Sequence, residues 1–305
     1  MPILVTGVSG YVGAALVPRL RLDGHAVRGF ARSAARVAEP VDELVEGDAV
    51  SGAGLDRALD GVEVAYYLIH SMEGAAAGAF PVQERAAAER FATAARAAGV
   101  RRIVYLGGLV PAAVVPSRHL ASRLVVEETL LAAAPESIAL RASIVIGARS
   151  RSFRFLVRLI ERLPVLALPG WRGNRTRPID GRDVTAFLAR AATAPARLAG
   201  SWDIAGPDTL SYEELIAGIA EVMLLRRPRL GVDGVTLTPL ASVIAAAVAG
   251  EDPALVGPLM ESLEHDLLPR DDTAAGAFGV RLHAFRAAVE RALGDWEREE
   301  ALAAR

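Results

Sequence analysis

The N-terminal segment PILVTGVSGYVG constrains the fold of this chain more than any other stretch. The unbroken apolar run at 2–7 is typical of a strand buried on both faces, and a helical pattern follows at 11–24. Between them, Gly7, Gly10 and Gly13 stand in a GxxGxxG spacing. Such glycines let the chain turn tightly, let a diphosphate approach the backbone, and let the helix pack closely on the strand. Because a helix N-terminus also offers free N–H groups, the segment predicts a dinucleotide site, the alternative being a tight turn without a ligand.

The first 150 residues alternate between strand-like and helix-like segments. Apolar runs predict further strands at 25–32, 42–48, 61–70, 101–108 and 137–147. Helical patterns lie at 79–99 and 118–134. Strands separated by helices imply a parallel sheet with right-handed crossovers and helices on both faces. We therefore predict a doubly wound α/β fold.

The pattern loosens after residue 150, and its later part suggests a second region. A helix at 180–193 and a strand at 201–206 still match the pattern of the sheet, whereas the residues after 210 read as mostly helical. We expect a dinucleotide-binding domain at 1–150, to which 178–206 returns, and a smaller, mostly helical substrate or cap region at 151–177 and 207–305.

The composition excludes several classes of function. The 305 residues carry 34 basic and 36 acidic side chains, and this balance gives no electrostatic basis for binding nucleic acid. Neither cysteine nor lysine occurs, which excludes disulfides, thiol nucleophiles, Schiff bases and a P-loop lysine. The five histidines show no paired metal-ligand spacing. The start, MPILVTG, has no basic leader, and the apolar run at 240–250 is too short to span a bilayer, so we expect a cytoplasmic protein without a membrane partner.

The end of the second predicted strand distinguishes the two pyridine dinucleotides. An NAD site carries Asp or Glu there to accept from the ribose hydroxyls. The stretch VRGFARS instead contains Arg28 and Arg32, and arginine suits the 2′-phosphate of NADP. We therefore favour NADP over NAD, with Arg32 and Ser33 as contacts, the alternative being that both arginines are solvated. Asp48 is expected either to accept from the adenine amino group or to cap the following turn.

Several motifs resemble those of a known family. TGVSGYVG, RRIVYLGGL and WDIAGPDTLSYEEL are similar to motifs of the extended and atypical short-chain dehydrogenases/reductases. HLASR and RLPVLALPGW look most like the atypical NAD(P)H-binding group that includes NmrA-like proteins. The resemblance implies a Rossmann domain bearing a small C-terminal substrate domain. Together with the reasoning above, it predicts cofactor contacts at Thr6, Gly7, Ser9, Gly10, Tyr11, Val12, Gly13, Arg32, Ser33, Asp48, Leu68, His70, Gly107, Arg123 and Ser143.

The resemblance also locates a catalytic pair and shows where it departs from the family. Active members use Tyr-x-x-x-Lys, in which the tyrosine exchanges a proton with the substrate and the lysine holds the nicotinamide ribose. Alignment on RRIVYLGG places His119 at the tyrosine position and Arg123 at the lysine position, and Gly107 and Gly108 replace the expected serine. His119 is then predicted to act as an acid or as a neutral electrophile beside the guanidinium. Two alternatives stay open: a site that binds cofactor without turnover, and a pair that only caps a helix.

We accordingly expect an NADP(H)-dependent oxidoreductase acting on a small carbonyl or enone compound. The alternative is a non-catalytic NAD(P)H-binding regulatory or assembly protein. Sugar-nucleotide epimerisation is disfavoured because the tyrosine and the lysine are both missing. The apolar stripe of a helix predicted at 281–298 is expected to pack on its own domain, with a homo-oligomeric contact as the alternative.

Further side chains are weaker candidates. His70 follows the fourth predicted strand and would line the nicotinamide pocket, as wall or as catalyst. Ser143 would either bind the carboxamide of the cofactor or pack at a strand end. Trp171, Arg175 and Arg177 lie in a segment at 168–178 that would form either a lid over an anionic or aromatic substrate or a solvated loop.

Four acidic residues complete the predictions. Asp180 and Asp183 are expected at a helix N-terminus, where the helix dipole favours carboxylates. Glu127 and Glu128 are expected on a solvated helix face.

Overall fold

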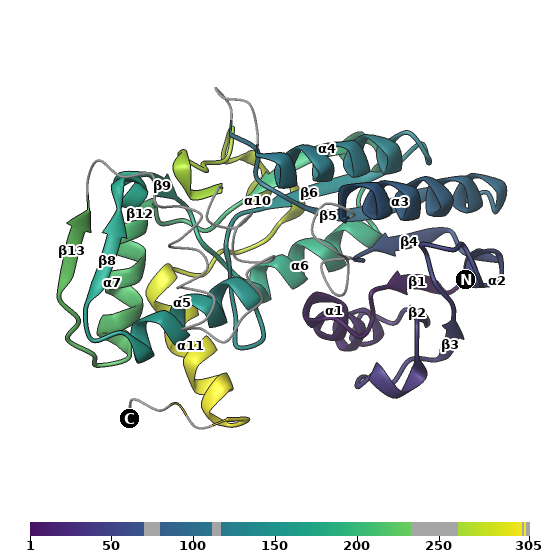
Figure 1. The fold of residues 1–305 in the computed structure, drawn as a ribbon. Helices are drawn as coiled ribbons and strands as arrows, with labels where there is room; N and C mark the ends of the chain where they lie inside the picture. The colour runs from purple at the N-terminus through teal and green to yellow at the C-terminus, as the bar shows by residue number, and fades with distance from the viewer. Residues whose placement is uncertain (70–79, 112–116, 233–261, 301, 303–305) are drawn as a thin grey trace.

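Seven parallel strands form the central sheet of the protein, in the order β11-β6-β5-β4-β1-β2-β3 (Figure 1). A computed structural model describes residues 1–69, 80–111, 117–232, 262–300 and 302. The strands of the sheet are β1 (Ile3–Thr6), β2 (Val27–Ala31), β3 (Glu43–Glu46), β4 (Val64–Tyr67), β5 (Arg102–Gly108), β6 (Ile138–Ala142) and β11 (Gly200–Ile204). Because the strand order reverses between β1 and β4, the doubly wound fold is confirmed, and its topological switch point lies between these two strands.

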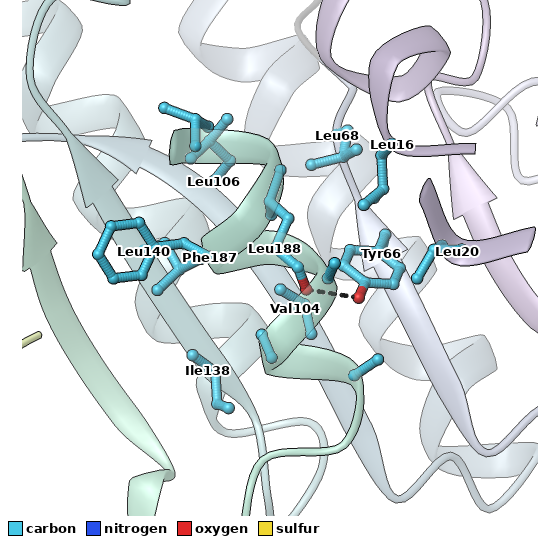
Figure 2. Close-up of a cluster of buried hydrophobic side chains, with 14 of the residues drawn as sticks. Leu16, Leu20, Tyr66, Leu68, Val104, Leu106, Ile138, Leu140, Phe187 and Leu188 are labelled. Atoms are coloured by element: carbon cyan, nitrogen blue, oxygen red, sulfur yellow. Dashed lines mark hydrogen bonds between the residues drawn. The ribbon is translucent and has the colours of Figure 1, made fainter. Parts of the chain in front are cut away.

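Helices cover both faces of the sheet. On one face α1 (Tyr11–Leu22) packs against α6 (Gly181–Ala192), and on the other α3 (Phe80–Ala97) packs against α2 (Leu55–Leu59) and α4 (Arg118–Leu131). The sequence of strand β4 has no charged residue because its side chains enter the apolar cores on both faces of the sheet. Tyr66 enters the core under α1 and α6, where its hydroxyl donates to the carbonyl of Leu188 at 2.7 Å (Figure 2). Tyr67 faces the other core, where its ring lies 5.0 Å from that of Phe91.

The C-terminal region has an apolar core of its own, to which α5 (Arg151–Arg162), α7 (Tyr212–Val222) and α11 (Phe285–Glu297) contribute. Its other regular elements are β7 (Val145–Ile146), β8 (Leu166–Pro169), β9 (Arg175–Thr176), β10 (Ile179–Asp180), β12 (Leu210–Ser211) and β13 (Arg229–Val232). Helix α10 (Thr273–Phe278), which was expected in the cap region, packs instead on α6 and β11, where Phe278 contacts Phe187 and Trp202. Three two-stranded sheets join β10 to β7, β12 to β9 and β13 to β8. In Figure 1 this region lies beside the carboxyl ends of β5 and β6.

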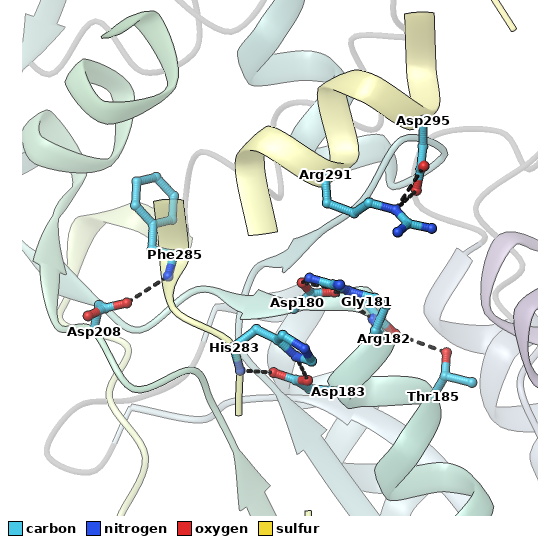
Figure 3. A network of polar contacts seen from close by, with 10 residues as sticks. All are labelled: Asp180, Gly181, Arg182, Asp183, Thr185, Asp208, His283, Phe285, Arg291 and Asp295. Carbon is cyan, nitrogen blue, oxygen red and sulfur yellow. Dashed lines mark hydrogen bonds and ion pairs between the residues drawn. The ribbon is translucent and has the colours of Figure 1, made fainter. Parts of the chain in front are cut away.

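Two segments differ from the sequence-based expectation. The run at 137–147 is not one strand, because the chain leaves the sheet after Ala142 and pairs with β10 as the separate strand β7. The last helix begins at Phe285 rather than at 281, because the segment before it is held in another conformation. Asp183 accepts from the backbone N–H of His283 at 2.8 Å, and Asp208 accepts from that of Phe285 at 2.6 Å (Figure 3). The apolar stripe of α11 packs on its own chain, as expected.

Candidate functional site

The predicted phosphate turn joins β1 to α1 and is locked against the end of β4. Gly7 has φ +67°, and a Cβ there would lie 2.5 Å from the carbonyl oxygen of Leu68. A Cβ on Gly13 would lie 2.4 Å from the carbonyl oxygen of Gly7, so the close approach of helix and turn also requires glycine. Gly10 is the N-cap residue of α1, and within the described part of the chain no side chain caps this helix. The turn therefore offers free backbone N–H groups at the switch point, which fits a dinucleotide diphosphate.

Thr6, the last residue of β1, fixes the phosphate turn to the end of β4. Its hydroxyl donates to the carbonyl of Tyr66 at 2.9 Å and accepts from the backbone N–H of Leu68 at 3.2 Å. The side chain is fully buried, so Thr6 ties β1 to β4. Ser9 is exposed on the turn, and Val12 packs at the edge of the core. Thr6 thus positions the turn, whereas Ser9 lies on its accessible side.

Tyr11 begins α1 but its side chain extends toward the C-terminal region. A Cβ on Gly147 would lie only 2.0 Å from the Tyr11 hydroxyl oxygen, and a Cβ on Gly181 only 2.1 Å from it, so both positions require glycine. Burial, and then the charge of Asp180, raise the pKa of Tyr11 to about 12, so the phenol is neutral at physiological pH. Beside it, a cavity of about 300 Å³ extends between α1, α6 and α11. The Tyr11 side chain therefore packs between the phosphate turn and the start of α6. Any contact of Tyr11 with a diphosphate would come from its backbone N–H.

The two arginines that follow the phosphate turn have different surroundings. Arg28 is only 12% exposed; its guanidinium bonds to Glu43 at 2.6 Å and to the carbonyl of Asp60 at 2.6 Å, so it is a structural residue and neither solvated nor available to a cofactor. Arg32 is exposed just after β2, and no other described residue forms a hydrogen bond or ion pair with its guanidinium. Asp48 caps its own turn, because its Oδ1 accepts from the backbone N–H of Val50 at 2.9 Å.

Helix α4 carries the predicted catalytic pair. Ser117 is the N-cap residue, and His119 stands in the first helical turn, although its side chain and the whole of His70 lie outside the described residues. Arg123 donates to the carbonyl of Leu106 at 2.8 Å, and its guanidinium carbon lies 5.9 Å from the centre of the Tyr105 ring. Arg123 is thus held against β5.

A buried carboxylate that the sequence analysis did not single out lies next to Arg123. Glu84 of α3 is 2% exposed and accepts from the hydroxyl of Ser122 at 2.8 Å. Burial raises the pKa of Glu84, while the charge of Arg123 and the bond from Ser122 act against this shift. Glu84 continues the buried stripe of Ala87, Ala88 and Phe91 by one helical turn, so its burial was readable from the period of α3.

A second buried ion pair corrects the expectation for Glu127. This side chain is buried and forms a bidentate pair with Arg141 of β6, at 2.7 Å for the closest atoms. Ser201 of β11 also donates to Glu127. Glu128 is exposed, as expected. Glu127 lies seven residues after Leu120 and hence on the same inward face of α4, which explains why it is not solvated.

The remaining candidates lie around the same edge of the sheet. Gly107 lies within β5, and a Cβ there would lie 3.1 Å from the ring of Tyr105. Ser143 is buried, and its hydroxyl lies 3.2 Å from that of Thr176, so its oxygen is already engaged within the protein. Ser33 precedes a short 3-10 helix and is half-buried.

Side-chain contacts fix the segment at 168–178, although Gly170, Gly173 and Arg175 are exposed. Trp171 packs edge-on against Tyr212, with ring centres 5.9 Å apart. Arg175 pairs with Asp266 at 2.9 Å, and Arg177 pairs with Asp272. These contacts give the segment a fixed position, while its role as a lid stays a prediction.

Asp180 and Asp183 start α6, as predicted. Asp180 is the N-cap residue and accepts from the backbone N–H of Arg182 at 2.7 Å. Asp183, in the first turn, binds the ring Nδ1 of His283 at 2.5 Å (Figure 3). Burial raises the pKa of Asp183, and its hydrogen bonds from His283 oppose that shift. Asp183 thus joins the start of α6 to the segment before α11, whereas Asp180 bonds within its own helix.

The described part of the chain shows neither a cluster of metal ligands nor a helix that could cross a membrane. No three acidic or histidine side chains among these residues are grouped as they would be to hold a metal ion. None of the described helices combines the length and apolarity that a membrane span needs.

Comparisons with known proteins agree with this geometry. Residues 7–142 match the family model for NAD(P)H binding. The chain is 27% identical over 268 residues to the ceramide reductase of Caulobacter vibrioides, which covers 84% of this chain and 81% of that protein. A shorter stretch of 112 residues is 34% identical to the 3 beta-hydroxysteroid dehydrogenase/Delta 5-->4-isomerase of Mycobacterium tuberculosis, covering 34% of this chain and 30% of that protein.

Solved structures share the fold over almost the whole chain. A short-chain dehydrogenase/reductase superfamily protein from Agrobacterium tumefaciens with bound NAD superposes with a TM-score of 0.72 at 21% identity, covering 98% of each chain. MoeE5 in complex with UDP-glucose and NAD superposes with a TM-score of 0.69 at 20% identity, covering 98% of this chain and 99% of that one. Residues 7–142, which contain the uncapped phosphate turn at the switch point, thus form an NAD(P)H-binding domain, and the chain has the fold that these solved structures share.

Proposed function

We propose that this protein is an NADP(H)-dependent oxidoreductase that moves a hydride to or from a small carbonyl or enone compound. The observation that carries the proposal is the phosphate turn, whose free N–H groups lie at the switch point of a doubly wound sheet. When bound, the dinucleotide supplies the hydride chemistry. The chain itself contributes the cradle for the diphosphate, the cation beside the adenosine ribose, and the polar pair on α4.

The proposed preference for NADP depends on Arg32. Its exposed guanidinium follows β2, where the adenosine ribose lies in this fold, and a bidentate bond to a 2′-phosphate is the interaction that arginine favours. Arg28 would play no part, because Glu43 and three backbone carbonyls engage it.

Removing Arg32 tests the cofactor preference. We expect Arg32→Ala to weaken NADPH binding by about 10- to 100-fold, the loss of one charge-assisted bond, and to change NADH binding less than about threefold. Fluorescence titration of both nucleotides measures this directly. Arg19→Ala, at the far end of α1, removes a half-exposed charge that pairs with Asp23 and is the control. Wild-type protein that binds NADH as tightly as NADPH would contradict the assignment.

The role of the α4 pair can be tested by returning it to the family pattern. We expect His119→Phe to lower kcat by about 100-fold or more, since general acid catalysis contributes at least that much, and to leave NADPH binding unchanged. The double variant His119→Tyr with Arg123→Lys should recover activity. NADPH oxidation is followed with small aldehydes, ketones and enones, and with a ceramide-related ketone because a relative is a ceramide reductase. His265→Phe, at an exposed site, is the control; turnover that survives His119→Phe discards His119 as the acid.

A second function, an NAD(P)H-binding regulatory protein without turnover, has one observation in its favour. Arg123 bonds to the carbonyl of Leu106 and lies over the ring of Tyr105, so part of its guanidinium is engaged by β5. Tight cofactor binding, no oxidation of NADPH with any compound of the panel, and no gain from the Tyr/Lys double variant would together favour this function over catalysis.

A further inference from the structure

A carboxylate from β3 reaches the place where the proposed cofactor preference is decided. Glu46 is the last residue of β3 and pairs in register with Ala31, the last residue of β2. Hydrogen bonds fix this strand end, since the backbone N–H of Gly47 donates to the carbonyl of Ala31 at 3.0 Å. In a Rossmann sheet, the adenosine ribose lies beside the end of β2. Glu46 is thus next to the ribose position although it is far from the segment in which an acidic residue is usually sought.

The side chain of Glu46 also reaches across the turn that contains Arg32. Its Oε1 accepts from the backbone N–H of Ala34 at 2.6 Å, so the side chain spans the turn formed by Arg32 and Ser33. Glu46 is exposed, and this is its one side-chain hydrogen bond among the described residues. The second carboxylate oxygen therefore remains an available acceptor at the turn that contains Arg32. The turn from Arg32 to Ala34 thus carries the positive charge of Arg32 and binds the negative charge of Glu46.

We propose that Glu46 is a specificity-determining residue that opposes Arg32 in the choice between NADPH and NADH. This inference rests on the proposed function. A ribose 2′-hydroxyl can donate a hydrogen bond to a carboxylate, whereas a 2′-phosphate is an anion that the same carboxylate repels. Arg32 attracts the 2′-phosphate, and Glu46 lowers the gain by repulsion and by occupying the N–H of Ala34. The protein therefore prefers NADPH over NADH less strongly than it would if Arg32 acted without Glu46.

Glu46→Gln separates the charge from the hydrogen bond. Glutamine keeps an acceptor oxygen for the N–H of Ala34, so the turn is preserved while the charge is removed. We expect the ratio of the dissociation constants for NADH and NADPH to rise about tenfold, chiefly through tighter NADPH binding, and the rise to shrink at high salt. The measurement is a fluorescence titration of both nucleotides at two ionic strengths, and it needs no substrate.

Glu43→Gln is the matched control. It removes the same charge from the same strand, three residues earlier, where the carboxylate pairs with Arg28 instead of reaching Ala34. We expect its nucleotide ratio to equal that of the wild type. An unchanged ratio in Glu46→Gln, or an equal rise in Glu43→Gln, overturns the role of Glu46. A wild type that prefers NADH but shifts toward NADPH in Glu46→Gln supports the role while contradicting the NADP preference, and a wild type that binds neither nucleotide refutes the proposed function itself.

Discussion

Replacing Arg102 by methionine is expected to lower the free energy of unfolding by about 3–5 kcal/mol, the usual cost of breaking a buried charge pair on one side. The side chain is 1% exposed and crosses from β5 to the end of α6. Its guanidinium donates to the carbonyls of Ala191 and Ala192 at 3.0 and 2.9 Å, and it pairs with Glu136 at 2.6 Å. Methionine fills a similar volume but leaves these carbonyls without a donor, and they belong to the last turn of α6, where a cation also complements the helix dipole.

Its neighbour Arg101 is the control for this prediction. Arg101 also pairs with Glu136, but its side chain is 43% exposed and solvent can replace the bond. We expect Arg101→Met to cost less than about 1 kcal/mol, as exposed ion pairs do. Urea unfolding followed by circular dichroism measures both variants. Equal midpoints for the two variants would show that the buried contacts of Arg102 contribute little.

Gly7→Ala is expected to weaken binding of either dinucleotide by about a hundredfold or more, because the N–H groups of the turn must point at the diphosphate. An alanine Cβ at this position would stand 2.5 Å from the carbonyl oxygen of Leu68, and the backbone has φ +67°. The carbonyl belongs to the backbone that follows β4 and cannot rotate away as a side chain would. The turn, the end of β4, or both must shift.

Gly24→Ala separates the steric contact from the backbone strain. Gly24 has φ +86°, but a Cβ there would meet nothing within 4 Å. We expect this variant to lose about 1–2 kcal/mol of stability from the left-handed conformation alone and to bind nucleotide like the wild type. Calorimetric titration of NADPH and NADH provides the comparison. If Gly7→Ala binds as Gly24→Ala does, then the close approach of the turn to Leu68 is unimportant for the site.

Local patterns in the sequence were sufficient to predict the architecture and the phosphate turn. An apolar strand followed by GxxGxxG and a helix is specified within 24 residues, because the geometry of glycine and the helix dipole act over that short distance. The same holds for Asp180 and Asp183, which act on the first turn of the helix that they begin. The buried positions of Glu84 and Glu127 were also present in the helical period, but each was an acidic residue whose burial depends on a partner elsewhere in the chain.

Only the tertiary structure decided which residues the charged side chains interact with. Arg28 and Arg32 are four residues apart and look alike in the sequence, yet Glu43 and the carbonyls at the end of α2 engage Arg28 and not Arg32. Glu127 of α4 meets Arg141 of β6, and Glu46 meets Ala34 because β3 lies beside β2. The physical reason is that a charged side chain takes its role from whatever lies within a few ångströms of its end. For residues brought together by strand pairing, that neighbour is set by the folded chain and not by the adjacent sequence.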